Sequence, residues 1–150
     1  MNEFFNNTHR QIFTYNKNIG HLFVPNLNAR VINENGGYYV HTNSLGFRSD
    51  SEFEERKGNK PRILFFGDSN TASDGVSNSE RFSELVGDHF NVEIYNYGLS
   101  GSGTDQQYLI YKEYAEKIDH DLVIIAILVE NIRRVNAKYR FYLNDKGRRV

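Results

Sequence analysis

The chain has 150 residues, of which 39% are hydrophobic and 25% charged, a balance that fits one globular domain with a buried core. Its 18 basic and 19 acidic side chains leave a net charge of −1 without a basic stripe, so nucleic-acid binding has no electrostatic support. Cysteine is absent, which excludes disulfides and thiolate metal sites.

Membrane and export signals are not visible in the sequence. The longest apolar run, residues 122–129, is far too short to span a bilayer. The first seven residues lack the basic region and apolar stretch of a secretory signal. We therefore expect a cytoplasmic protein with no membrane span.

The first 60 residues are polar and rich in Asn, and we treat them as an N-terminal extension that ends in a charged linker over residues 49–60. Residues 29–33 and 38–42 are strand formers that flank Asn35 and Gly36, which is a strong hairpin signal. The extension is compatible with a lid, a partner-binding arm or an edge of the domain.

From residue 61 the pattern changes to that of a main domain over residues 61–150. Residues 62–66 form a short apolar run, typical of a buried parallel strand. Ser77 and Glu80 have the spacing of a capping box, and a helix with one apolar face is predicted after it. That face comprises Phe82, Leu85, Val86, His89 and Phe90.

A second strand is predicted over residues 92–97, followed by a glycine-rich loop at 98–103 and a helix that Thr104 and Gln107 would cap. Most of the tyrosines on this helix are expected to pack in the core. Residues 122–129 are the most apolar run and predict a central strand buried on both faces. Residues 141–150 predict a further hairpin.

The alternation of strands and helices predicts an α/β protein with a parallel sheet and right-handed crossovers. In such sheets, sites form beyond the carboxyl ends of the strands. The first strand is followed there by Ser69, the second by Gly101 and the third by Asn131. We expect the Ser69 hydroxyl, the Gly101 amide and the Asn131 carboxamide to gather around one point. Donors converging in this way form an oxyanion hole, in which losing one donor costs about 3–4 kcal/mol of barrier.

These residues resemble the conserved blocks of the GDSL/SGNH hydrolases. Residues 67–69, Gly-Asp-Ser, resemble the first block, residues 96–101 the second, and Asn131 falls at the asparagine of the third. Residues 43–48 are similar to a segment that precedes the first block in bacterial members, often ones linked to cell-surface polysaccharides. The resemblance covers residues 43–145 and implies a three-layer, flavodoxin-like SGNH fold that is incomplete at its C-terminus.

The function that the resemblance implies is ester hydrolysis through an acyl-enzyme on Ser69, with Gly101 and Asn131 holding the oxyanion. The implied substrate is a small-molecule or carbohydrate acyl ester, an O-acetyl sugar among the candidates, and no cofactor or metal is implied. Oligomeric state does not follow from the sequence.

Two features depart from the family pattern. The third block usually reads Gly-x-Asn-Asp, whereas residues 129–132 read Val-Glu-Asn-Ile. The Asp-x-x-His block that supplies the base does not occur in the 150 residues. The resemblance therefore implies a base beyond Val150, and we expect residues 1–150 alone to show little turnover of p-nitrophenyl acetate.

Other functions remain open from the sequence. A sugar O-acyltransferase would use the same chemistry, and a truncated, non-catalytic binding form would explain the missing base. A phosphate-binding, flavodoxin-like module is a third alternative, although Gly98, Gly101 and Gly103 lack the spacing of the dinucleotide fingerprint.

Each candidate residue also has a structural interpretation. Ser69 fits a turn or helix cap, Gly101 a plain turn and Asn131 a strand-end cap. Asp68 is expected to hold its loop rather than to react. Arg133 and Arg134 are expected to be a solvated pair rather than a clamp for an anionic substrate.

Overall fold

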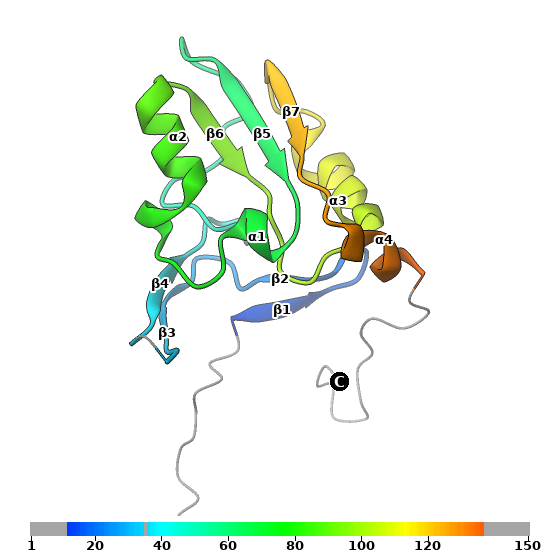
Figure 1. Cartoon of the computed structure of the whole chain (residues 1–150). Coiled ribbons are helices and arrows are strands. Elements are labelled where there is room, and N and C mark those ends of the chain that lie inside the picture. Colours follow the sequence, from blue (N-terminus) through cyan, green and yellow to red (C-terminus); the bar gives the residue numbers. More distant parts are fainter. Residues whose placement is uncertain (1–11, 35, 137–150) are drawn as a thin grey trace, which may run out of the picture.

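The computed structural model describes residues 12–34 and 36–136, and its centre is a parallel sheet of three strands (Figure 1). The strands are β5 (Arg62–Phe66), β6 (Glu93–Asn96) and β7 (Leu122–Ile125), in the order β6-β5-β7. Both β6 and β7 run parallel to β5. The predicted α/β class with a parallel sheet is therefore confirmed.

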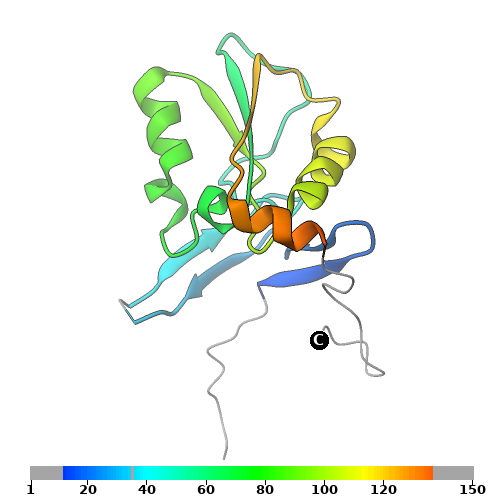
Figure 2. The same cartoon turned by 45° about the vertical axis from the view of Figure 1, so that its right-hand side comes forward.

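Helices lie on both faces of this sheet, and Figure 2 shows it between α2 and α3 as the middle of three layers. The helical elements are α1 (Ser69–Ala72), η1 (Asn78–Glu80), α2 (Phe82–Phe90), α3 (Thr104–Ile110), the π-helical turn η2 (Tyr111–Ala115) and α4 (Val129–Val135). Within the described residues, no helix has the length and apolarity needed to cross a membrane.

The strand order creates a switch point between β5 and β7. The chain leaves β5 through α2 to reach β6 on one side, then crosses through α3 to place β7 on the other side. Ligands of open α/β sheets bind beyond the carboxyl ends of the strands at such a switch point. In Figure 1, α1 and α4 lie at this end of the sheet.

Two antiparallel hairpins precede the sheet. The second, β3 (Asn28–Val31) with β4 (Tyr38–His41), is the predicted hairpin and is confirmed. The first, β1 (Phe13–Asn16) with β2 (Gly20–Phe23), was not predicted, and it lies across the carboxyl end of the sheet (Figures 1 and 2). Its turn is built by the Asn16 side chain, whose Oδ1 accepts from the N–H groups of Asn18 and Ile19, each at 3.0 Å.

One hydrophobic core runs across the predicted boundary at residue 60. Phe23 and Phe47 from the N-terminal part pack in the same buried cluster as Leu64, Phe66 and Tyr97 from the sheet. The Phe47 ring meets the Tyr97 ring edge-on, with centroids 4.8 Å apart. The N-terminal residues are thus built into the domain.

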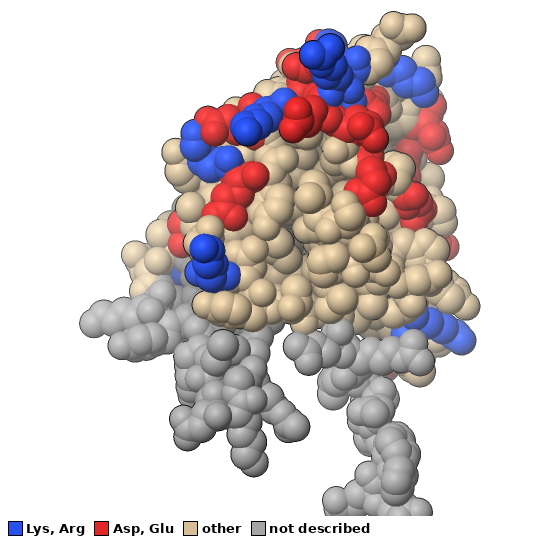
Figure 3. Space-filling model, turned by 180° about the vertical axis from the view of Figure 1, so that it is seen from behind, with Lys and Arg blue, Asp and Glu red and all other residues tan. Residues whose placement is uncertain are grey.

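Charge is concentrated at the amino ends of the strands. Lys57 pairs with Asp121, and Arg62 pairs with Glu93. Seen from behind, charged side chains gather at the top and along the flanks, while the middle of the face is largely uncharged (Figure 3).

Three of the predicted helices and strands need correction. β7 ends at Ile125 and lies at an edge of the described sheet, with Leu122 49% and Ile125 55% exposed, so the expected central, doubly buried strand is wrong. β5 is the central strand because the crossover through α3 places β7 on the side of β5 opposite to β6. α2 exists as predicted, but its predicted apolar face is largely exposed: only Val86 is half-buried, whereas the other four residues are exposed, namely Phe82, Leu85, His89 and Phe90.

The third correction concerns the start of α3. Gly103 is the N-cap, and its N–H donates to Oε1 of Gln106 at 3.1 Å, so the predicted Thr104–Gln107 pairing is displaced by one residue. Of the predicted helical tyrosines, Tyr108 is exposed, so it does not pack in the core. The hairpin predicted for residues 141–150 lies outside the described residues.

Candidate functional site

Ser69 is the first residue of α1, three residues after the end of β5. Asp68 caps this helix: its Oδ1 accepts from the Asn70 N–H at 3.0 Å, which confirms the structural role predicted for Asp68. The first N–H groups of a helix have no partner inside the helix, and Ser69 is at that position. Ser69 thus lies where the chain turns from strand into helix.

The loop after β6 packs tightly against this turn. The Leu99 N–H and the Ser102 hydroxyl donate to the Gly67 carbonyl oxygen at 3.0 and 3.1 Å. A Cβ on Gly98 would stand 2.3 Å from the backbone nitrogen of Ala72 in α1, so only glycine permits this approach. Gly98 therefore serves close packing between the two loops.

Gly101 lies at the tip of the same loop. The Ser102 N–H donates to the Leu99 carbonyl at 3.1 Å, which closes a turn around Ser100 and Gly101. Gly101 has a φ of +75°, the conformation that a type II turn requires at its third residue. It is exposed, and no atom lies within 4 Å of the position a Cβ would take. Its backbone is therefore open to a ligand.

Asn131 lies in the first turn of α4, six residues after β7 ends, so its predicted place directly after the strand is corrected. The side chain is fully buried. Its Nδ2 donates to Oδ2 of Asp68 at 2.9 Å, and its Oδ1 accepts from the Leu128 N–H at 3.1 Å and from Nε2 of Gln107 at 3.4 Å. Asn131 thus caps α4 and also links it to the turn at Ser69.

Arg134 is not solvated as predicted. Its guanidinium donates to Oδ2 of Asp68 at 3.2 Å and to the Ser102 carbonyl at 3.0 Å. Arg133 matches the expectation, because its side chain is 77% exposed and its guanidinium pairs with Glu130, one turn earlier in α4. The signal that separates the two arginines is spacing: Arg134 lies three residues after Asn131, on the same face of α4.

These contacts set the charge state of Asp68. Burial alone would raise the pKa of its carboxyl group, but hydrogen bonds from Asn131 and the Asn70 N–H, together with the Arg134 guanidinium, lower the pKa below its ordinary value. Asp68 is therefore an anion at neutral pH and a fixed acceptor for the groups around it.

The hydrogen bonds join the loops that follow all three strands. Asp68 belongs to the loop after β5, Ser102 to the loop after β6, and Asn131 and Arg134 to α4 after β7. Ser69 directly follows Asp68, and Gly101 directly precedes Ser102. The elements that carry the three candidate residues therefore meet at the switch point of the sheet.

The sequence did not predict a further set of contacts around the Ser69 and Gly101 loops. The Ser100 hydroxyl donates to Oδ2 of Asp74 at 2.6 Å, and the Asp74 N–H donates to the Ser69 carbonyl at 3.0 Å. Nε2 of His21 in β2 lies 2.8 Å from the Ser100 carbonyl oxygen. No spacing rule connects residue 21 with residue 100, so this contact had no local signal.

Arg48 fixes the far end of α1. Its buried guanidinium donates to the carbonyls of Ala72 and Ser73 at 2.9 Å each, and to Oδ1 of Asn78. Burial, and then the nearby charge of Arg81, lower the pKa of Arg48 to about 10. Arg48 remains cationic at neutral pH and anchors the loop that follows α1.

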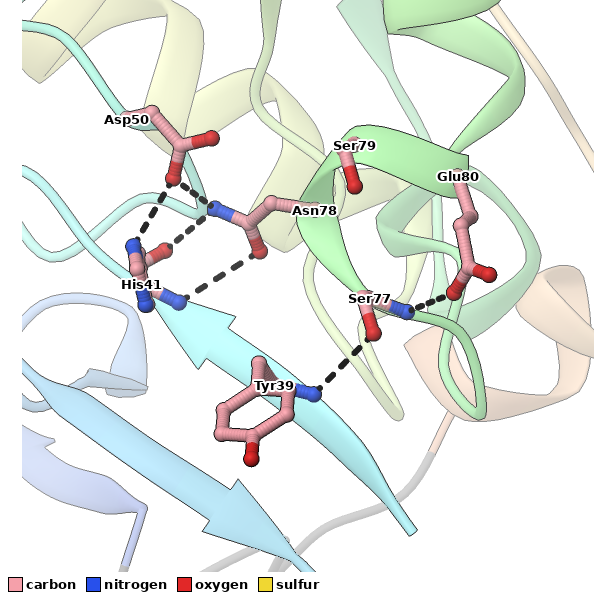
Figure 4. A pocket seen from close by; sticks show the side chains of 7 residues that line it. All are labelled: Tyr39, His41, Asp50, Ser77, Asn78, Ser79 and Glu80. Carbon is pink, nitrogen blue, oxygen red and sulfur yellow. Dashed lines mark hydrogen bonds and ion pairs between the residues drawn. The ribbon is translucent and has the colours of Figure 1, made fainter.

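A polar pocket lies beside Asn78, between β4 and η1 (Figure 4). His41 faces Asp50, with Nδ1 3.1 Å from Oδ1, and Tyr39 of β4 and Glu80 of η1 also line the pocket. The residues that line this pocket do not include the three candidate residues. Among the described residues, no group of three or more His, Asp or Glu is placed to hold a metal ion.

Comparison with known proteins gave no assignment: no protein-family model matches the sequence, and no curated protein matches it.

Proposed function

We propose that the protein is a serine ester hydrolase of the GDSL/SGNH type, with the fold of that family and Ser69 as its nucleophile. The observation that supports this most strongly is the hydrogen bond between Asp68 and Asn131, because it joins the serine turn to the start of α4 at the switch point. The tight contact of the Gly101 loop with the same turn adds to this support.

In the proposed reaction the Ser69 hydroxyl attacks the carbonyl carbon of an acyl ester, and its proton passes to a general base. The carbonyl oxygen becomes an oxyanion that accepts from the N–H groups of Ser69 and Gly101 and from the Asn131 carboxamide. Collapse releases the alcohol, which takes up the proton, and water then cleaves the acyl-enzyme to the acid. An O-acetyl group on a carbohydrate is the substrate that we propose to test first.

The role of Asn131 in this reaction depends on which partner each of its two amide N–H groups meets. A carboxamide carries two donors, and the bond to Asp68 uses one of them. The bond to Asp68 and the bonds to Oδ1 fix the amide plane. The second N–H is the one that the proposed oxyanion contact requires.

The experiment is covalent labelling with a fluorophosphonate of the protein produced from its complete natural coding sequence. We expect one label per chain, found on Ser69 by peptide mass spectrometry, and Ser69-dependent release of acetate from an acetylated sugar. Ser69→Ala should abolish both. Ser73→Ala, at the other end of α1, is the matched control and should leave both intact.

Labelling that persists in Ser69→Ala, or that is spread over several serines, would contradict the proposal. Asn131→Ala should slow turnover by about 10²–10³-fold, the usual loss for one oxyanion donor. Its folding is checked by circular dichroism, because the same side chain caps α4.

A further inference from the structure

His21 belongs to β2 of the first hairpin and contacts the loop that carries Gly101. It is 2% exposed. The Phe13 ring of β1 meets the imidazole edge-on, with centroids 5.3 Å apart and an interplanar angle of 81°. The ring therefore has a fixed orientation inside the hairpin.

The contact of His21 with Ser100 defines which ring nitrogen carries hydrogen. Nε2 is 2.8 Å from the Ser100 carbonyl oxygen. A carbonyl oxygen only accepts, so Nε2 must be the protonated nitrogen and the donor. The bond spans 79 positions of sequence, so it is a tertiary contact rather than part of a local turn.

The Ser100 carbonyl and the Gly101 N–H belong to the same peptide group. No cis peptide occurs among the described residues, so this peptide is trans and planar. In a trans peptide the C=O and N–H bonds point in opposite directions. Holding the carbonyl against His21 therefore directs the Gly101 N–H away from the hairpin.

This peptide is also the one whose rotation separates two turn types. It is the central peptide of the turn closed by Leu99 and Ser102, and types I and II differ by a flip of that peptide. The φ of +75° at Gly101 corresponds to type II. A flip to type I would take the Ser100 carbonyl away from His21 and reverse the amide.

We infer that His21 is a positioning residue, which holds the Ser100–Gly101 peptide in its type II orientation so that the Gly101 N–H faces a bound ligand. A donor from the N-terminal hairpin thus sets the direction of an amide on the loop after β6. The consequence for rate rests on the proposed function, whereas the orientation of the peptide does not.

The orientation is tested by NMR on ¹⁵N-labelled protein, through the shift and residual dipolar coupling of the Gly101 N–H. His21→Leu fills the site with an apolar side chain of similar bulk but removes the donor, and we expect both values to move. His21→Gln places an N–H at a similar distance from the backbone and should restore them. His41→Leu, in the other hairpin, is the matched control and should leave them unchanged.

A measurement on the wild type keeps the inference testable if His21→Leu does not fold. The imidazole ¹⁵N shifts at neutral pH should show hydrogen on Nε2 of His21. An unprotonated Nε2, or an unchanged Gly101 coupling in a folded His21→Leu variant, would overturn the inference.

The rate provides the second readout. If Ser69-dependent turnover exists, His21→Leu should lower kcat by up to about 10²–10³-fold with little change in KM, because an oxyanion contact forms only in the transition state. His21→Gln should recover most of the rate. Absence of turnover in the wild type would count against the proposed hydrolase alone, and the NMR result would then decide the role of His21.

Discussion

Asp68 is the residue on which the contacts of the site converge. One carboxylate oxygen accepts from the helix backbone at Asn70, and the other accepts from Asn131 and Arg134. The Asn70 side-chain amide also donates to the carboxylate, at 3.3 Å, and a buried anion that accepts from these four donors stabilises the fold only while it remains charged. The pKa of Asp68 is lowered because those bonds favour its charged form.

We expect Asp68→Asn to destabilise the protein by about 1–3 kcal/mol at neutral pH, because an amide has only one accepting oxygen and cannot accept from all four donors. The folded-state pKa of Asp68 lies below its unfolded value, so the stabilisation is complete above the unfolded pKa, about 3.9. It is lost as pH falls through the folded pKa. Urea unfolding of both proteins across this range should show the difference shrinking with acidification.

The control for this substitution is Asp119→Asn, at an exposed position before β7. It should change the free energy of unfolding by less than about 0.5 kcal/mol. A constant difference between wild type and Asp68→Asn down to the lowest pH would show that Asp68 does not act through its charge.

At the scale of elements, the loop after β6 can lie against α1 because Gly98 has no side chain. A Cβ on Gly98 would meet backbone atoms of Thr71 and Ala72 at 2.6 and 2.3 Å. Backbone cannot move aside as a flexible side chain can, so the loop and α1 would have to separate.

Gly98→Ala should therefore destabilise the protein by about 1–3 kcal/mol or more, measured by thermal or urea unfolding. Gly58→Ala provides the comparison, because nothing lies within 4 Å of its Cβ position. That variant should remain within about 0.5 kcal/mol of the wild type. Equal effects at both positions would contradict the packing argument.

Elements whose signals are local were predicted well from the sequence. β5 and α2 follow from a short apolar run and from helical periodicity, and the β3–β4 hairpin follows from its Asn-Gly turn. The β1–β2 hairpin was missed because the Asn16 side chain builds its turn without that signal.

Pairings between distant residues were not predictable. The apolar run at β7 shows that the strand is hydrophobic but does not show which strands pair with it. The strand was therefore predicted at the centre of the sheet, whereas it lies at the edge. Ser69, Gly101 and Asn131 were placed at strand ends by pattern, whereas the links that His21 and Arg134 make to the same loops depend on tertiary contacts.

At the scale of the whole molecule, the first N-terminal hairpin and the sheet share one core. Phe23 is 1% exposed, and it belongs to the same cluster as Leu64 of β5. A shared core predicts that the two parts unfold together, since neither keeps its apolar surface covered without the other.

Phe23→Ala should cost about 3–5 kcal/mol, comparable with loss of a large side chain from the sheet itself. Unfolding in urea, followed by far-UV circular dichroism and by tyrosine fluorescence, should give one coincident transition in both proteins. Ile32→Ala, at a residue that is 63% exposed, should have little effect. Two separated transitions would show that residues 12–60 are an independent unit.

The bonds that complete the site connect distant parts of the chain, and this has a consequence for folding. His21 and Ser100 are 79 positions apart, and Asp68 and Asn131 are 63 apart. Long closures cost more chain entropy than local helices and form more slowly. During synthesis on the ribosome, the first hairpin and β5 emerge well before Asn131 and Arg134, so the network around Asp68 cannot close until α4 has been made.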